Sequence, residues 1–314
     1  MKICILGAGA LGCAIGAALT EASHHVWLLN RTEAAASALN RDGLSVVDER
    51  GERTVRVQAA SRAAEVGPVD LVVVLVKSFH TREAITGAAA LIGAHTAVLS
   101  LQNGLGHEDI LAEVVGRERV LAGKTYVGGV MLGPGRIRSG VVGKHTIVGE
   151  LGGAHSERVQ TIAQAFNAAG LVTEVSHNIL GAMWDKLLIN VATGALSGIT
   201  RLTYGELYAV PELRDTALAA VAEAMAVARA GGVSLSLSAP EQAWQLASAG
   251  LPASFKTSML QSLEKGSVTE IDFINGAVVR WGAVHGVPTP VNQTLVAAIK
   301  GIERTLLNHT GVPA

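Results

Sequence analysis

Cysteine is scarce in this sequence: only Cys4 and Cys13 occur among 314 residues. So few cysteines exclude a disulfide framework, and we expect both side chains to be small buried hydrophobes rather than redox centres or metal ligands. The sequence therefore predicts no metal site and indicates a reduced, cytoplasmic protein.

Charge of one sign is not in excess either, because 25 lysines and arginines stand against 26 aspartates and glutamates. This balance leaves no basic surface for nucleic acid or for an anionic membrane, so a small-molecule partner is expected. Long hydrophobic runs are also missing. The longest strongly apolar run, residues 71–76, is far too short to span a bilayer and suits a strand buried on both faces. Whether the chain forms a homodimer stays open.

The most informative motif is a glycine-rich segment that follows a short apolar run and consists of Gly7, Ala8, Gly9, Ala10, Leu11 and Gly12. If a strand ends at Leu6 and a helix begins near Ala10, the unpaired N–H groups of the helix N-terminus point at a bound pyrophosphate. In such a motif Gly7 makes the tight turn, Gly9 lets the backbone approach the phosphates, and Gly12 lets the helix pack against the strand.

A helical stretch at residues 11–23 and a strand-like run at 25–30 would complete a βαβ unit. The basic residue Lys2 followed by an apolar stretch also suits a signal peptide. The strand pattern that follows at once favours Met1 as the mature start.

Strand-like and helical segments alternate up to about residue 177, which predicts a doubly wound α/β domain of the Rossmann type. Within it, residues 44–57 suggest a hairpin laid onto the sheet, and strand-like runs at 120–127 and 145–148 flank a glycine-rich segment. From residue 179 onward the pattern is helical, with one expected helix at 270–285. We therefore expect a dinucleotide-binding domain at 1–177 and an all-helical substrate and catalytic domain at 178–314.

The end of the second strand bears on the choice of dinucleotide. NAD-binding units usually carry an acidic residue there, whereas this chain has Asn30 and Arg31. Arg31 can hold a 2′-phosphate bidentately, which favours NADP(H), although it also fits a solvated loop. Lys77 and Asn103 each follow a buried strand at its carboxyl end, where ligands bind in open α/β sheets. Each is equally compatible with an ordinary loop residue.

A reductase that uses a nicotinamide needs a proton donor at the substrate's carbonyl oxygen. Lys186 and Asn190 are four residues apart and share one face of an expected helix near the start of the second domain. A lysine ammonium can donate the proton. On spacing alone, a surface lysine of an amphipathic helix is the favoured interpretation.

In its glycine motif, its strand ends and its expected Lys186 helix, the chain resembles the ketopantoate reductase family, also called 2-dehydropantoate 2-reductase. The resemblance rests on residues 1–12, 76–77, 102–104, 184–190, 257–260 and 269–276. It implies a Rossmann domain followed by a helical domain, and NADPH-dependent reduction of ketopantoate to pantoate on the route to pantothenate.

The resemblance also implies roles for single residues. The family's catalytic lysine matches Lys186 and its active-site glutamate matches Glu270, while its substrate-contacting residues match Asn190 and Ser258. Asn103 and Lys77 match positions beside the nicotinamide, with Asn103 also near the substrate, and Arg31 matches the 2′-phosphate ligand. Without the resemblance, Glu270 would be read as a helix N-terminal glutamate after a Thr269 cap.

Three departures put the substrate in question. Gly194, Tyr204 and Phe255 stand where the family's enzymes often have asparagine. Loss of these polar groups predicts a less polar pocket with weaker selection for ketopantoate. The alternatives are a related reductase for another 2-oxoacid or an opine-like compound, and a catalytically silent NADPH-sensing protein.

Overall fold

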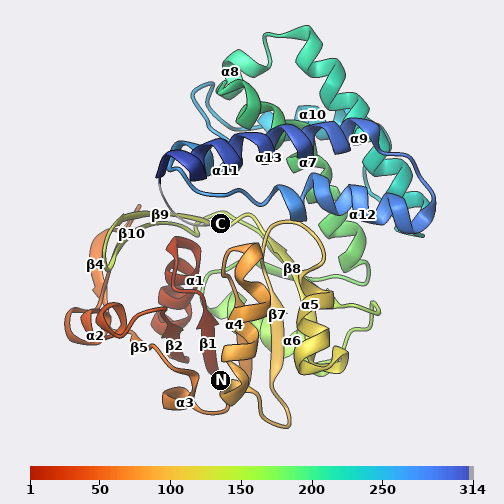
Figure 1. Ribbon diagram of the computed structural model, residues 1–314. Helices are drawn as coiled ribbons and strands as arrows, with labels where there is room; N and C mark the ends of the chain where they lie inside the picture. Colours follow the sequence, from red (N-terminus) through yellow and green to blue (C-terminus); the bar gives the residue numbers. More distant parts are fainter. Residues whose placement is uncertain (311–314) are drawn as a thin grey trace. The chain divides into compact units, whose positions relative to one another are not determined.

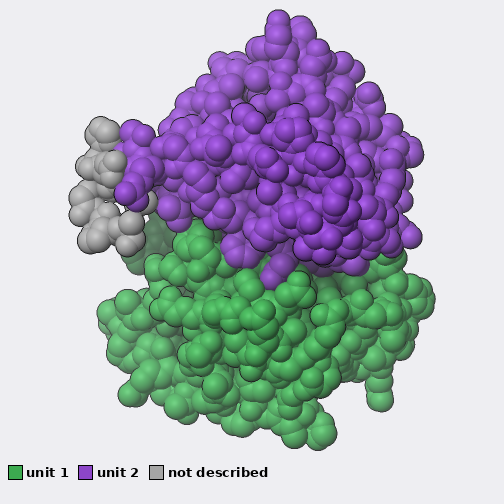
Figure 2. Space-filling view, turned by 45° about the vertical axis from the view of Figure 1, so that its right-hand side comes forward, with its two compact units in different colours: residues 1–102, 107–179 green, residues 103–106, 180–314 purple. Residues whose placement is uncertain are grey.

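The computed structural model describes the backbone of residues 1–310 and the side chains of residues 1–306. The chain forms two compact units, shown in green and purple in Figure 2. The first contains Met1–Gln102 and His107–Ile179, and the second contains Asn103–Gly106 and the residues from Leu180 onward. The division therefore falls close to residue 177, but the loop Asn103–Gly106 groups with the second unit.

The first unit is built on an eight-stranded sheet with the order β12-β11-β8-β7-β6-β1-β2-β5 (Figure 1). Its strands are β1 (Lys2–Leu6), β2 (His25–Leu29), β5 (Gln58–Ala60), β6 (Leu71–Val74), β7 (Ala97–Ser100), β8 (Val120–Thr125), β11 (Thr146–Glu150) and β12 (Thr173–Val175). Neighbouring strands are parallel except β11 and β8, which are antiparallel. The Rossmann-type sheet expected from the sequence is thus confirmed, with one antiparallel pair added.

Helices cover both faces of this sheet. They are α1 (Ala10–Glu21), α2 (Glu33–Asp42), α3 (Ala63–Val66), η1 (Ser78–His80), α4 (Thr81–Gly87), η2 (Ala89–Leu91), α5 (His107–Val115), η3 (Arg117–Arg119) and α6 (Glu157–Ala168). Because side chains alternate along β1, Ile5 joins one apolar core with Ile15 of α1, while Leu6 joins a second core with Ile85 of α4. These two cores make the domain doubly wound.

Cys4 and Cys13 are both free and buried in the first unit. Burial raises the pKa of each thiol to about 12, so neither is a thiolate at neutral pH. Their expected character as small buried hydrophobes is confirmed.

A separate four-stranded sheet with the order β4-β3-β10-β9 packs on α1. It contains β3 (Leu44–Asp48), β4 (Gly51–Val55), β9 (Gly128–Gly133) and β10 (Arg136–Gly140). The expected hairpin at residues 44–57 forms, but its placement on the main sheet was wrong. β3 pairs with β10, from the glycine-rich segment, and buries Ile137 completely. This long-range pairing outweighs the low strand propensity of glycine.

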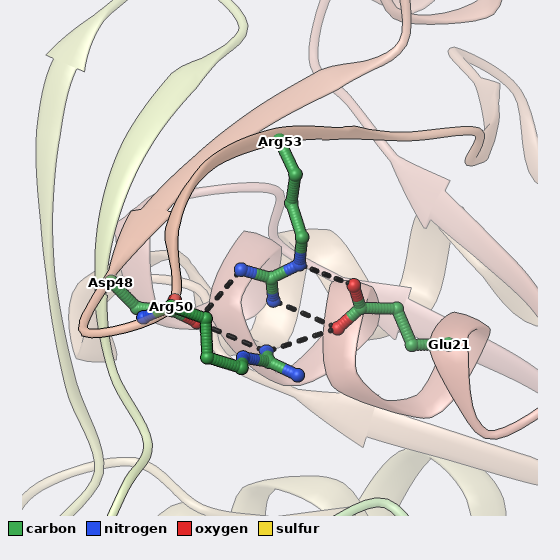
Figure 3. Close-up of polar contacts among 4 residues, drawn as sticks. All are labelled: Glu21, Asp48, Arg50 and Arg53. Carbon is green, nitrogen blue, oxygen red and sulfur yellow. Dashed lines mark hydrogen bonds and ion pairs between the residues drawn. The ribbon is translucent and has the colours of Figure 1, made fainter.

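An ionic cluster ties the hairpin to α1 (Figure 3). The Arg53 guanidinium donates to Glu21 of α1 at 2.5 Å and to Asp48 at 2.8 Å, and Arg50 lies 3.0 Å from Asp48. Burial raises the pKa of Asp48, but hydrogen bonds from Arg50 and Arg53 outweigh this effect and lower it to about 2. The cluster borders a cavity of about 400 Å³ along the alanines of α1.

The second unit is helical, and its described residues contain no strand. Its helices are α7 (Ile179–Thr200), α8 (Tyr204–Leu207), α9 (Pro211–Ala230), α10 (Pro240–Ser248), α11 (Ser258–Glu264), η4 (Ile271–Phe273), α12 (Asn275–His285) and α13 (Pro290–Thr310). Across residues 1–310, α7 alone has the length and apolar composition needed to cross a membrane. Of its most apolar window, 67% is buried inside the chain, as in a core helix.

The continuous helix expected at 270–285 was wrong. A short 3₁₀ turn, η4, precedes α12, and Ile274 separates them with φ −105° and ψ −96°. The Phe273 carbonyl accepts a hydrogen bond from the Leu105 N–H, a long-range partner that replaces the helical one. Glu270 therefore precedes a tight turn instead of lying in the first turn of an α-helix.

Candidate active site

The glycine motif joins β1 to α1 as its three glycines predict. Gly7 has φ +114°, and a Cβ there would lie 2.7 Å from the Val76 nitrogen. A Cβ at Gly12 would lie 2.1 Å from the Gly7 carbonyl oxygen, whereas one at Gly9 would meet nothing within 4 Å. The turn and packing roles of Gly7 and Gly12 are confirmed, and the backbone at Gly9 is open to a ligand.

The N-terminus of α1 suits an anion. Its cap is Gly9, which has no side chain to accept from the first amides, and its first turn contains no acidic residue. Those N–H groups and the positive end of the helix dipole therefore remain for a bound phosphate. The segment Gly7, Ala8, Gly9, Ala10, Leu11 and Gly12 could thus cradle a pyrophosphate.

Arg31 lies just beyond β2 and is exposed. Within the described residues, its guanidinium has no ion-pair or hydrogen-bond partner and is available to a ligand. β5 was not predicted from the sequence and pairs in parallel with β2. Arg62 follows the carboxyl end of β5 and therefore lies at the same edge of the sheet as Arg31. The Glu33 carboxylate is also near, where it accepts from Ser61 at 2.6 Å. Arg62 itself donates to the Glu65 carboxylate at 2.7 Å, so this edge combines two arginines with two carboxylates.

Gln102 organises the carboxyl ends of β6 and β7. Its buried side-chain amide donates to the Val76 carbonyl at 2.9 Å and to the Thr81 hydroxyl at 2.8 Å. These bonds fix the turn that carries Lys77, an exposed residue directly before η1. No role was predicted for Gln102 from the sequence, although its position directly after a buried strand was the available signal.

In the second unit, Lys186 and Asn103 meet directly. The Lys186 Nζ donates to the Asn103 Oδ1 at 2.8 Å, although 83 residues separate them in sequence. Lys186 is half-buried on α7. The bond to the amide oxygen orients the Lys186 Nζ, as a proton donor must be oriented.

The loop that carries Asn103 is fixed beside the turn that follows Glu270. The Leu105 N–H donates to the Phe273 carbonyl at 2.9 Å. Gly104 has φ +98°, and a Cβ there would lie 2.3 Å from that same carbonyl oxygen, so only glycine fits. Asn103 and Glu270 are thereby carried by two segments bonded to each other.

Asn190 is half-buried one helical turn after Lys186, and Ser258 is exposed at the start of α11. Neither side chain has a hydrogen-bond partner among residues 1–306, so both polar groups are available to a ligand. A Cβ at Gly194, one further turn along α7, would meet only the Met259 methyl group, at 3.6 Å. The face of α7 that bears Lys186 and Asn190 thus continues into an uncrowded, apolar position.

Tyr204 and Phe255, two of the unusual residues, pack together with ring centroids 5.0 Å apart. Tyr204 is only 6% exposed, and its hydroxyl lies 3.1 Å from the Thr193 hydroxyl. Burial raises the pKa of the Tyr204 phenol above its usual range, although the Thr193 bond lowers it. The hydroxyl groups of Tyr204 and Thr193 therefore bond to each other. The Tyr204 and Phe255 rings then form an aromatic pair that offers no free polar group.

In the second unit, Lys186 and Asn103 are in direct contact, Asn190 shares a face of α7 with Lys186, and Ser258 begins α11. The first unit carries the glycine loop, Arg31 and Lys77. No group of three or more histidine, cysteine, aspartate or glutamate side chains in the described part of the chain could hold a metal ion. Taken separately, the groups of the first unit can hold an anionic ligand, and those of the second unit include an ammonium that can donate a proton.

Comparisons with known proteins agree over nearly the whole chain. The family described as Ketopantoate reductase PanE/ApbA matches residues 3–153, and its C-terminal counterpart matches residues 178–303. A 2-dehydropantoate 2-reductase from Halobacterium salinarum is 36% identical over 308 residues, which cover 97% of this chain and 99% of the relative.

Two solved structures are similar along the same length. A PanE/ApbA family ketopantoate reductase from Ralstonia eutropha has 34% identity and a TM-score of 0.89, and covers 98% of this chain and 99% of its own. D-mandelate dehydrogenase, in a ternary structure with NADH and anilino(oxo)acetate, has 27% identity and a TM-score of 0.89 over the same shares of the two chains.

Proposed function

Because this chain belongs to the ketopantoate reductase family, and is therefore a pyridine-nucleotide oxidoreductase acting on a ketone or alcohol, we propose that it reduces ketopantoate to pantoate with NADPH. This reaction is a step of pantothenate biosynthesis, for which a cytoplasmic site is expected. The observation that carries the proposal is the hydrogen bond from Lys186 to Asn103, which holds an ammonium ready to protonate a carbonyl oxygen.

The proposed cofactor fits the first unit. Gly7, Gly9 and Gly12 shape a loop with open space at Gly9 and unblocked helix amides, which would hold the pyrophosphate. When bound, NADPH supplies the hydride that adds to the carbonyl carbon of the substrate. Lys77, at the carboxyl end of β6, would contact the nicotinamide side of the cofactor.

In the second unit, Lys186 would donate its proton to the carbonyl oxygen as the hydride arrives. Asn103 holds the ammonium through its amide oxygen and would also contact the cofactor and substrate. Glu270 would accept hydrogen bonds from Lys186, the cofactor ribose or the substrate hydroxyl. The unsatisfied amide of Asn190 and hydroxyl of Ser258 would hold the substrate's oxygens.

The preference for NADPH over NADH depends on Arg31. Its guanidinium is exposed and available, and no acidic residue ends β2 to bind a ribose 2′-hydroxyl. The similar D-mandelate dehydrogenase was solved with NADH, so the fold by itself does not select the phosphorylated dinucleotide. Arg31 favours the phosphorylated form here, because its guanidinium can hold a 2′-phosphate bidentately.

A second candidate substrate is a 2-oxoacid with a bulkier apolar side chain. Gly194 leaves an uncrowded position beside Met259. Tyr204 and Phe255 form an aromatic pair without free polar groups. The similarity to D-mandelate dehydrogenase favours this candidate as well. Missing hydrogen-bond partners reduce discrimination for a polar substrate much more than missing methylenes do.

A panel of 2-oxoacids assayed by NADPH consumption separates these functions. Highest kcat/KM for ketopantoate supports the first proposal, whereas highest kcat/KM for an aryl or branched 2-oxoacid supports the second candidate. Tight NADPH binding without turnover of any substrate would refute both and leave an NADPH-sensing role.

A further inference from the structure

The segment that carries Glu270 is bonded to α13 just before the glutamate. The Thr269 N–H and hydroxyl both donate to the Glu303 Oε1, at 2.6 and 2.7 Å. Thr269 is 3% exposed and Glu303 5% exposed, so these bonds lie in a dry environment. A buried carboxylate is costly unless it is well bonded, which makes this attachment rigid.

The same segment is bonded to α13 just after the glutamate. The Asp272 carboxylate forms an ion pair with Lys300, whose Nζ also lies 3.4 Å from Glu303. Burial lowers the pKa of Lys300, but the bond to Asp272 and the charge of Glu303 outweigh this effect and raise it. Arg280 adds a 2.6 Å hydrogen bond to the Asp272 carbonyl. Lys300 and Glu303 are three residues apart on α13, so they face the same side of the helix.

Glu270 thus lies between two attachments to one turn of α13, at Thr269 and Asp272. It lies outside the regular hydrogen bonding of α12, because η4 and Ile274 interrupt the helix there. The Glu270 carbonyl accepts from the N–H groups of Phe273 and Ile274, at 3.0 and 3.2 Å, so the turn itself holds its backbone. Glu303 and Lys300 fix this turn against α13 on either side of Glu270. An active-site group misplaced by about 1 Å can lose about a hundredfold in rate.

We infer that Glu303 and Lys300 are positioning residues for Glu270, with Glu303 the dominant one. The inference rests on the proposed role of Glu270. It predicts that the catalytic effect of removing Glu303 passes through Glu270, so the effect vanishes once the Glu270 carboxylate has been removed.

A double-mutant cycle on the full chain tests this coupling. Glu303→Ala should lower kcat/KM about tenfold in the wild-type background and less than twofold in a Glu270→Gln background. Its effect on kcat should exceed its effect on the dissociation constant of NADPH. An equal fold-loss in both backgrounds would show a general structural role and overturn the inference.

Glu223→Ala is the matched control. The Glu223 carboxylate accepts from the backbone N–H groups of Val291 and Asn292 at 2.8 and 3.0 Å, so it also anchors α13, but far along the sequence from Glu270. Its effect on kcat/KM should be the same in both backgrounds, because its anchoring does not pass through Glu270.

Two further outcomes are distinguishable. If Glu270→Gln alone keeps full activity, the proposed role of Glu270 and the inference are both overturned. If Glu270→Gln lowers kcat/KM but Glu303→Ala causes the same fold-loss in both backgrounds, only the inference is overturned. If Glu303→Ala does not fold, Lys300→Met removes the more exposed half of the attachment and must show the same non-additivity. Additive losses for Lys300→Met would then refute the positioning role.

Discussion

Replacing Lys186 with methionine should lower kcat for the preferred 2-oxoacid by about 10²–10⁴-fold, the usual contribution of a general acid. This corresponds to about 3–5 kcal/mol of activation free energy. Methionine keeps an unbranched apolar stem on the half-buried face of α7 and removes only the ammonium that donates to Asn103. The folded structure should therefore survive with little loss of stability.

The assay compares steady-state NADPH oxidation with NADPH binding measured by fluorescence. We expect the dissociation constant of NADPH to change less than threefold, because the cradle for the dinucleotide lies in the first unit. Lys256→Met is a matched control, since Lys256 pairs with Glu264 on the surface of the same unit and should leave kcat unchanged within about twofold.

The variant Lys186→Ala tests the same proton-donor role by chemical rescue. A small primary amine added to this variant should restore part of kcat, because the free ammonium can replace the missing proton donor. If Lys186→Met keeps more than a tenth of the wild-type kcat, the proton comes from another group. If kcat and thermal stability fall together, Lys186 supports the fold instead of the reaction.

The other predictions concern the cofactor edge, the loop and the hairpin. Arg31→Ala should weaken NADPH binding about 10- to 100-fold, because charge-assisted bonds to the 2′-phosphate are lost, and should change the dissociation constant of NADH less than twofold. Titrations with both dinucleotides measure this, and equal losses for NADPH and NADH would refute a 2′-phosphate contact. Gly104→Ala should abolish most turnover, because its Cβ would meet a carbonyl oxygen, whereas Gly51→Ala has a similar φ of +100° in open space and should cost only stability. Equal turnover in both variants would contradict this. Asp48→Asn should lower the unfolding free energy by up to about 2 kcal/mol at pH 7, since the folded pKa of Asp48 is about 2 against 3.8. The difference from wild type should shrink as pH falls from 4 toward 2, and a pH-independent difference in denaturant melts would refute the electrostatic explanation.

Local patterns in the sequence predicted the local structure well. α9 spans Pro211–Ala230, because Pro211 suits the first helical turn and Gly231 ends the helix. Thr32 caps α2 by accepting from the Ala35 N–H, and the turn at Gly7 follows from its glycine. Each of these features depends on residues close to one another in sequence.

Long-range contacts could not be predicted in the same way. The glycine-rich segment gave no strand pattern of its own, yet β10 forms because β3, far earlier in the chain, offers a partner and a buried site for Ile137. The break before α12 likewise depends on the Leu105 N–H, which takes the carbonyl of Phe273. A periodicity over 270–285 contains no information about either partner.

The candidate site shows the same limit in its chemistry. Sequence placed Asn103 at the end of a strand and Lys186 on a later helix, and only the fold joins them at 2.8 Å. Sequence also indicated a less polar pocket from Tyr204, but could not show that its hydroxyl is already bonded to Thr193. Because that hydroxyl has a partner, Tyr204 cannot replace a lost asparagine without breaking a buried bond. Selection among 2-oxoacids should therefore depend on the space at Gly194 more than on new polar contacts.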